Sequence, residues 1–353
     1  MAPHSSPSPA ANGTAGCAIT SWASALPERV VTNTDIMTLF DTSDQWIVER
    51  TGIRRRRAAD GPFVYPRPPA SPPDGLGTTA LLATQAGQAA LEKAGLAGND
   101  IDLLVLCTTS ADQLVPATSS PVAHALSIRG GAMDINAACA GFTYGLVTAA
   151  SFIGAGAERV LLIGAETLSR ITNWYDRSNA FLFGDGAGAV VVEAVPGETS
   201  LLGWDIGVDG SLVALCYADH GGPGMVMRGQ EVFRRAVRIT VESALRSLER
   251  AKVEAADISL FVPHQANSRI MDAIAERLGI PSEHIASAIE DTGNTSSASI
   301  PIALTAAADS GRLSAGDLVL FAGFGVGMTW SSAVWRWTGA RASSSPPATL
   351  PAN

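Results

Sequence analysis

The stretch DINAACAGFTYGL, from Asp134 to Leu146, shows how the centre of this chain folds. A short apolar run meets a group of small residues with Cys139 in its middle, and the run that follows is apolar on nearly all sides. Such a run is typical of a helix buried inside a protein rather than one on its surface. The stretch therefore predicts a strand, a tight turn and a buried helix, with a cysteine in the first turn of that helix.

Cys139 has two interpretations at this point. A thiol at a helix N-terminus lies near unsatisfied backbone N–H groups and the positive end of the helix dipole, and both lower its pKa. We therefore expect an activated nucleophile, with small neighbours that let a ligand approach closely. The alternative is a structural cysteine, because most free cysteines behave as small buried hydrophobic residues.

The composition argues against several classes of protein. The chain has 353 residues and a formal net charge of -9, so it has no overall attraction for nucleic acid or for an anionic membrane. Its four cysteines lie far apart, without a CxxC pair or a nearby histidine. That distribution predicts neither a metal site nor a disulfide framework, and it indicates a reducing, cytoplasmic compartment. No apolar run is long enough to span a bilayer.

Three segments have the composition of tails or loops. Residues 1–15 are rich in Pro, Ser and Ala but lack the pattern of a secretory signal, and residues 339–353 have a similar composition. We expect both to be disordered tails. Residues 60–77 are rich in proline and glycine, which predicts a long loop. Long loops in compact domains are usually functional or mobile.

An internal repeat organises the rest of the chain. The matching segments are Leu91–Ala94 with Leu248–Ala251, Asp100–Leu103 with Asp257–Leu260, and Ala157–Leu162 with Ala315–Leu320. The first two matches have a spacing of 157 residues and the third has a spacing of 158. Matches in the same order at nearly the same spacing indicate a duplicated α/β unit. We expect two halves, 16–195 and 196–338, packed about a pseudo-twofold axis.

The repeat also predicts where polar residues of the two halves meet. Cys139 lies between matched segments of the first half, and we expect Asn294, 155 residues later, at the equivalent place in the second. The predicted strand 260–262 runs directly into His264, at the edge of the sheet where ligands of α/β proteins bind. Taken alone, His264 could be a structural histidine and Asn294 a turn residue. Together with Cys139 they predict one polar interior site.

Five motifs resemble those of the β-ketoacyl-acyl carrier protein synthase III family, which belongs to the thiolase superfamily. The motifs are SDQWIVERTGIR at Ser43, ACAGF at Ala138, FGDGAGAVV at Phe183, PHQAN at Pro263 and GNTSSAS at Gly293. The resemblance covers about residues 18–335, with the motifs in family order. It implies an α/β, thiolase-like fold, in which duplicated α/β halves form five layers (αβαβα) around the pseudo-twofold axis.

The resemblance implies a decarboxylative Claisen condensation that initiates fatty acid or polyketide chains. Cys139, activated by its helix terminus and by His264, would take the acyl group of an acyl-CoA primer. His264 and Asn294 would then donate hydrogen bonds to the thioester oxygen of malonyl-acyl carrier protein as CO2 is lost. The product would be a 3-oxoacyl-acyl carrier protein. No metal and no cofactor other than the substrate CoA is implied.

The resemblance also implies binding residues. The oxyanion would be held by backbone N–H groups of Cys139, Gly325, Val326 and Gly327. The CoA entrance would consist of Trp46 and Arg177 on the adenine, Arg50 nearby, and Arg269 at the tunnel mouth. Arg234, with Arg235 and Arg238, forms a basic patch that suits an acidic carrier protein, although an ordinary solvated helix face fits these three nearly as well. The run Arg54–Arg57 is also expected to be a solvated face.

Two features depart from the family pattern. The family has a phenylalanine before the proline of the segment written here as SADQLVP, and that side chain reaches across a homodimer to close the acyl pocket. This chain has Val115, and the smaller side chain predicts room for a branched or medium-chain primer. Such primers are those of starter-unit synthases in secondary pathways. The loop at 60–77 is longer than in the family, which also predicts altered substrate choice.

Related functions on the same fold make different demands on the sequence. An acyltransferase would move the acyl group from Cys139 to a hydroxyl or amine, and it would not need the pair of His264 and Asn294. A non-catalytic partner subunit would lack Cys139. A thiolase would carry a second catalytic cysteine, and none follows the segment 323–328. The intact trio therefore favours condensation, with the acyltransferase as the alternative.

Overall fold

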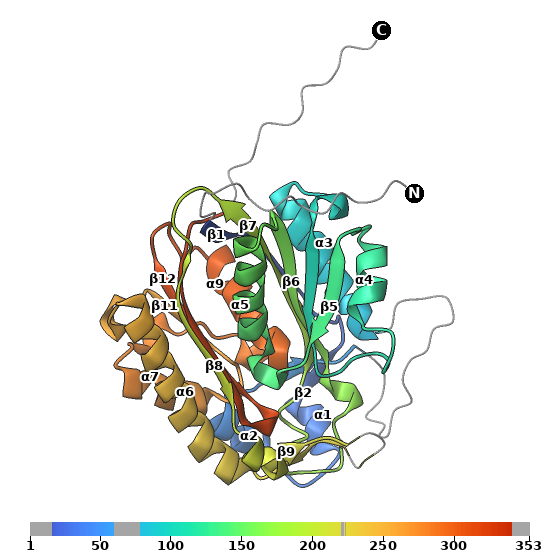
Figure 1. Ribbon diagram of the computed structural model, residues 1–353. Coiled ribbons are helices and arrows are strands. Elements are labelled where there is room, and N and C mark those ends of the chain that lie inside the picture. Colours follow the sequence, from blue (N-terminus) through green and yellow to red (C-terminus); the bar gives the residue numbers. More distant parts are fainter. Residues whose placement is uncertain (1–15, 60–77, 220–221, 223, 341–353) are drawn as a thin grey trace.

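Two β-sheets lie on either side of a central pair of helices (Figure 1). The computed structural model describes residues 16–59, 78–219, 222 and 224–340. The predicted tail at 1–15, the loop at 60–77 and all but two residues of the tail at 339–353 lie outside the described residues.

The first sheet has the strand order β1-β7-β6-β4-β5. Its strands are β1 (Gly16–Ala25), β4 (Leu103–Cys107), β5 (Gly131–Ile135), β6 (Arg159–Thr167) and β7 (Asp185–Val195). Strand β4 pairs parallel with both β5 and β6, whereas β7 runs antiparallel to β6 and β1. Every residue of β4 is buried, as expected for a parallel strand covered on both faces.

The second sheet repeats the first in the order β8-β13-β12-β11. Its strands are β8 (Leu201–Val208), β11 (Leu260–Pro263), β12 (Leu318–Gly325) and β13 (Thr329–Arg336). The parallel pair β11–β12 corresponds to β4–β6, and the antiparallel strands β13 and β8 correspond to β7 and β1. This match confirms the predicted duplication. The counterpart of β5 is reduced to a single parallel bridge between Ile285 and Phe261 of β11, and β5 itself forms an open edge of the first sheet.

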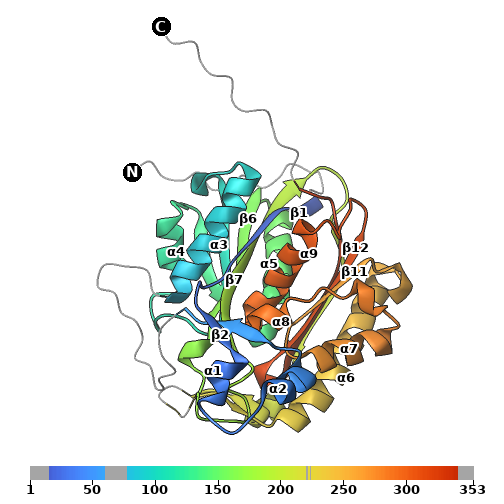
Figure 2. The same ribbon diagram turned by 180° about the vertical axis from the view of Figure 1, so that it is seen from behind.

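Helices form the other three layers (Figures 1 and 2). The central layer holds α5 (Gly141–Gly154) and α9 (Ser299–Asp309); α3 (Thr78–Ala94) and α4 (Ser119–Ala125) cover the first sheet; α6 (Gly229–Ala251) and α7 (Ser268–Leu278) cover the second. The central helices are apolar on most sides because they are covered by both sheets. The five-layered fold is the one predicted. None of the helices in the described ranges is long and apolar enough to cross a bilayer.

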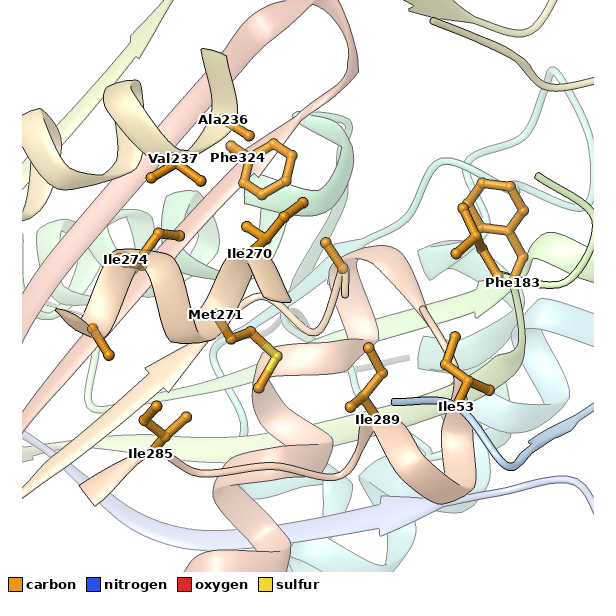
Figure 3. Packing of buried hydrophobic residues seen from close by; sticks show 14 of the residues in the cluster. Ile53, Phe183, Ala236, Val237, Ile270, Met271, Ile274, Ile285, Ile289 and Phe324 are labelled. Atoms are coloured by element: carbon orange, nitrogen blue, oxygen red, sulfur yellow. The ribbon is translucent and has the colours of Figure 1, made fainter. Parts of the chain in front are cut away.

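The N-terminal segment crosses from its own half to the second half. Its elements are β2 (Val30–Thr32), α1 (Asn33–Met37), α2 (Asp44–Thr51) and β3 (Arg55–Arg57), and α8 (Ile289–Thr292) lies against β3. Ile53 belongs to the same apolar cluster as Ile270 of α7, Ile289 of α8 and Phe324 of β12 (Figure 3). This crossing brings α2 to the cavity described below. The division of the chain at residue 195 stays a prediction.

The arginine run Arg54–Arg57 is not the uniform solvated face that was predicted. Arg55 is exposed and its Nε lies 2.6 Å from Oδ1 of Asp291 in an ion pair. Arg56 is fully buried, and its Nη2 donates a hydrogen bond of 2.6 Å to the carbonyl oxygen of Phe181. Successive side chains of a strand point to opposite faces, so β3 places neighbouring arginines in opposite environments.

Candidate active site

One cavity of about 540 Å³ joins the two halves of the molecule. Cys139, His264 and Asn294 all line it, so the structure brings the three predicted residues together. Its walls are largely apolar side chains from the segment after β6 and from the small ribbon β9 (Cys216–Tyr217) and β10 (Val226–Met227), together with the start of α6. A mostly apolar cavity with a few convergent polar groups is the usual form of a small-molecule site.

Cys139 lies in a tight turn, Ala138–Ala140, between β5 and α5. The turn requires a left-handed backbone at Ala138, where φ is 50°. Gly325, at the end of β12, packs directly on the turn: a Cβ atom there would lie 2.8 Å from the backbone nitrogen of Cys139. Gly325 and Val326 line the cavity, whereas Gly327 lies beyond them with φ of 75°. The predicted oxyanion loop is thus in contact with the cysteine turn.

The structure contradicts the prediction that the Cys139 thiol has a lowered pKa. Burial raises the pKa of this thiol to about 12, although the hydrogen bond with the Ser296 side chain acts in the opposite direction. The residue keeps part of its surface open to the cavity. Desolvation disfavours the thiolate more than its surroundings stabilise it. The unreacted thiol is therefore protonated at neutral pH.

His264 follows β11 and is held from two sides. Its backbone N–H donates a hydrogen bond of 2.8 Å to the carbonyl oxygen of Ala322 on β12, and its Nδ1 lies 2.7 Å from Oγ of Ser299 on α9. The ring also packs edge-on against Phe324, with 5.5 Å between ring centroids. Burial lowers the pKa of His264 to about 3, so the imidazole is neutral.

Asn294 lies in the loop between α8 and α9 with its amide orientation fixed. Its Oδ1 accepts a hydrogen bond of 2.9 Å from the backbone N–H of Ser296. Its backbone pairs with the segment before β7, donating to Leu182 and accepting from Gly184. Because the amide oxygen is engaged by the loop, the amide NH2 is the end available to a ligand in the cavity.

The predicted equivalence of Cys139 and Asn294 is wrong by three residues. The equivalent pairs are Asn136 with Asn294, Ala138 with Ser296, and Cys139 with Ser297, each 158 residues apart. In both loops an Asn side chain accepts a hydrogen bond from the backbone N–H two residues later, and that later residue has a left-handed backbone, with φ of 50° and 47°. Aligning NAACAG (136–141) with NTSSAS (294–299) gives this spacing of 158 residues. The third matched segment of the repeat has the same spacing.

The predicted entrance residues Trp46, Arg50 and Arg269 line the mouth of the cavity. Helix α2 supplies the first two and α7 supplies the third. The guanidinium carbon of Arg50 lies 4.5 Å from the centre of the Trp46 ring, and the edge of that ring meets Phe181. A cation stacked on an aromatic ring gives a rigid, positively charged entrance.

Three other predicted binding residues lie outside the cavity lining in the described structure. Arg177 and Arg234 are exposed, although their neighbours Ser178 and Phe233 line the cavity. Val115 is 81% exposed, in the loop between β4 and α4.

Sequence reasoning missed several residues that complete the site. Cys216, to which no role was assigned, lines the cavity beside Met225, with 3.8 Å between their sulfur atoms. Glu166, fully buried at the end of β6, accepts hydrogen bonds from Ser110 and Ser297 and so ties the two central loops together. Glu166 has no sequence signal because its partners lie 56 and 131 residues away in the chain.

A cysteine at the start of a buried helix, with an imidazole and an amide from the second half in the same cavity, defines a thiolase-fold acyl-transferring enzyme. Comparisons with known proteins narrow the class. Residues 133–210 match the family model for 3-oxoacyl-[acyl-carrier-protein] synthase III, and residues 248–337 match the model for its C-terminal part. The chain belongs to the β-ketoacyl-acyl carrier protein synthase III family.

Individual relatives agree over nearly the whole chain. Beta-ketoacyl-[acyl-carrier-protein] synthase III 1 of Bacillus anthracis is 43% identical over 314 residues, which cover 88% of this chain and 96% of the relative. The crystal structure of 3-oxoacyl-[acyl-carrier-protein] synthase III from Aquifex aeolicus has 42% identity and a TM-score of 0.85, covering 91% of this chain and all of that one. The priming β-ketosynthase of the R1128 polyketide pathway has 33% identity and a TM-score of 0.83, covering 94% and 99%.

Proposed function

We propose that this enzyme condenses an acyl-CoA primer with malonyl-acyl carrier protein, releasing CO2 and forming a 3-oxoacyl-acyl carrier protein. The observation that carries the proposal is the convergence of Cys139, His264 and Asn294 on one cavity with a cationic, aromatic mouth. Two nitrogen donors facing a nucleophilic cysteine suit an enolate intermediate, which a simple acyl transfer does not form.

In the first half-reaction the sulfur of Cys139 attacks the thioester carbon of acyl-CoA. The thiol is neutral beforehand, so its proton leaves as the carbon–sulfur bond forms, and CoA departs as the free thiol. The N-terminus of α5 and the backbone N–H groups beside Gly325 stabilise the charge that develops on sulfur and oxygen. The acyl group then extends along the apolar wall of the cavity.

In the second half-reaction the bond between the malonyl carboxylate and its methylene carbon breaks. The electron pair moves into an enolate whose oxygen accepts hydrogen bonds from His264 and Asn294, and CO2 is released. The enolate carbon attacks the acyl carbon on Cys139, and the cysteine sulfur leaves. Removing one such donor typically costs about a hundredfold in rate or more.

The proposed enzyme is a cytoplasmic homodimer. Four free cysteines suit a reducing compartment. The open edge of β5 lies near the loop that exposes Leu114 and Val115, which are 80% and 81% accessible in one chain. A second copy pairing along β5 would cover these side chains and place Val115 toward the partner's acyl pocket. The small valine then leaves room for a branched or medium-chain primer.

Two further sets of arginines are proposed to bind the two substrates. Arg177 would join Trp46 and Arg50 in holding the CoA nucleotide once it lies across the mouth. Arg234, with Arg235 and Arg238 on α6, would attract the acidic carrier protein. Arg238 is also paired with Glu242 at 3.9 Å, which weakens its share of that attraction.

The test is intact-mass detection of acyl-Cys139 with a panel of acyl-CoAs, followed by malonyl-acyl carrier protein. We expect branched and medium-chain primers to acylate faster than acetyl-CoA, and the added carrier protein to yield CO2 and a 3-oxoacyl product. Fastest acylation by acetyl-CoA contradicts the primer proposal. Transfer of the acyl group to an alcohol or amine without release of CO2 contradicts condensation.

A further inference from the structure

Ser299, the first residue of α9, contacts the catalytic imidazole from behind. It is 1% exposed, and its Oγ lies 2.7 Å from Nδ1 of His264. The same oxygen accepts a hydrogen bond of 3.2 Å from the backbone N–H of Gln265. The serine is therefore placed between a side chain that can accept or donate and a backbone group that can only donate.

The single hydroxyl hydrogen of Ser299 decides the protonation pattern of the ring. The Gln265 N–H occupies a lone pair of Oγ, so the hydroxyl hydrogen needs an acceptor of its own. Nδ1 of His264 is the acceptor that the described residues offer within hydrogen-bonding distance. If Nδ1 accepts, the proton of a neutral imidazole is on Nε2, the nitrogen remaining for the cavity.

The surrounding loop prevents Ser299 and His264 from separating. The Gln265 side chain donates to the carbonyl oxygens of Pro263 at 2.7 Å and Ala286 at 3.2 Å, and its Oε1 accepts from the Ala288 N–H at 3.0 Å. The polypeptide on both sides of His264 is thus fixed by a buried amide.

We propose that Ser299 is a positioning residue that holds His264 as the Nε2–H tautomer, so that the ring enters condensation as a hydrogen-bond donor. This inference rests on the proposed function. It makes His264 and Asn294 alike, because in each the acceptor atom is engaged by the protein and the donor is left for the enolate oxygen. In this tautomer Nε2 has no free lone pair to take the Cys139 proton, so the ring is not the base of the acylation step.

The kinetic test compares Ser299→Ala with Ser332→Ala. Ser332 is a buried serine whose hydroxyl contacts those of Ser243 and Ser247, away from His264, which makes it a matched control. We expect Ser299→Ala to lower kcat for CO2 release from malonyl-acyl carrier protein by about tenfold, part of the loss seen when a donor is removed outright. KM for that substrate and the rate of Cys139 acylation should change less than about threefold. Ser332→Ala should match the wild type.

The spectroscopic test reads the tautomer directly in protein labelled with ¹⁵N-histidine, with the His264 signals assigned by their absence in His264→Gln. The wild type should show a proton on Nε2 and a bare Nδ1, and Ser299→Ala should show exchange between both tautomers. Should Ser299→Ala fail to fold, Ser299→Cys keeps the volume with a much weaker donor and takes its place.

Three results would overturn the proposal: a proton on Nδ1 in the wild type, an unchanged kcat for CO2 release in Ser299→Ala, or an equal loss in acylation and condensation. The tautomer measurement separates this inference from the proposed function. A wild-type enzyme that does not condense but shows the Nε2–H tautomer contradicts the proposed function alone.

Discussion

Cys139 and His264 share one cavity, and burial drives each of them toward its neutral form. The pKa of the thiol rises to about 12 and that of the imidazole falls to about 3. A thiolate–imidazolium pair is therefore not the state of the unreacted enzyme. The enzyme holds a neutral thiol beside a neutral ring, and the charge appears only when a thioester arrives to receive it.

Alkylation of Cys139 by iodoacetamide tests the raised thiol pKa. Only the thiolate reacts, so with a pKa of about 12 the rate should rise roughly tenfold for each pH unit between about 7 and 10. The modified peptide is followed by mass spectrometry, and Cys139→Ala gives the background from the other cysteines. A rate that levels off by about pH 8 would mean that the dipole of α5 outweighs burial.

Acid sensitivity of folding tests the lowered pKa of His264. The imidazole has an ordinary pKa of 6.5 in the unfolded chain and a pKa of about 3 in the folded protein, so between these values the unfolded chain binds a proton that the folded one refuses. This residue therefore makes the free energy of unfolding fall as pH drops below 6.5, by up to about 1.4 kcal/mol per pH unit.

Urea unfolding of the wild type and of His264→Gln, from about pH 7 to about pH 4.5, measures that contribution. We expect the free energy of unfolding of the variant to fall less steeply as the pH drops, because the variant lacks the contribution of His264. The carboxylates that also titrate are common to both proteins, so their contributions cancel in the comparison. Parallel pH dependences would mean that His264 is protonated in the folded state.

At the scale of elements, the three-residue strand β3 fixes the floor of the cavity through Arg56. The buried guanidinium donates to Oδ1 of Asn33 at 2.8 Å and to the carbonyl oxygen of Phe181, whose ring lines the cavity. Its Cβ also packs close to Gly293, beside Asn294. One side chain thus joins α1, β3 and two loops of the site.

Replacing Arg56 by Met should lower the free energy of unfolding by roughly 2–4 kcal/mol, since two buried oxygens lose their donor while the volume is kept. Arg55→Ala is the matched control on the same strand: it removes only an exposed ion pair with Asp291 and should leave stability almost unchanged. Chemical denaturation of both variants checks this. Equal effects would show that Arg56 contributes no more than a surface arginine.

The elements around the site differ in how far the sequence predicts them. The strand, turn and buried helix around Cys139 were predictable because apolar runs and small residues report burial directly. The burial of Arg56 was not, because four successive arginines have no periodicity in composition. Ser299 and Glu166 were missed for a related reason: each works through a partner more than 30 residues away. The equivalence of Asn136 and Asn294 could be predicted from the sequence, because both follow the spacing of 158 residues that the third matched segment of the repeat shows.

At the scale of the molecule, the two halves of the duplication differ at one edge of their sheets. Strand β5 ends the first sheet with Gly131 and Ala132 exposed, whereas the corresponding edge of the second sheet has only the single bridge between Phe261 and Ile285. Exposed edge strands are usually covered or paired. This asymmetry, and the exposed Leu114 and Val115 nearby, could not be predicted from the repeat, because the repeat reports only what the halves share.

Ala132→Pro tests pairing of two copies along β5. Gly131 N–H donates to the Asp102 carbonyl oxygen on the β4 side, and in a parallel pair successive residues alternate, so the Ala132 N–H points outward. Proline there removes a donor to a partner strand but none within the chain. We expect the variant to dimerise at least about tenfold more weakly in sedimentation analysis, because a symmetric pair loses one hydrogen bond from each copy and both edge strands are displaced. Ala132→Ser, which keeps the N–H, should dimerise as tightly as the wild type under the proposed homodimer. Dimerisation of Ala132→Pro with unchanged affinity would place the interface elsewhere.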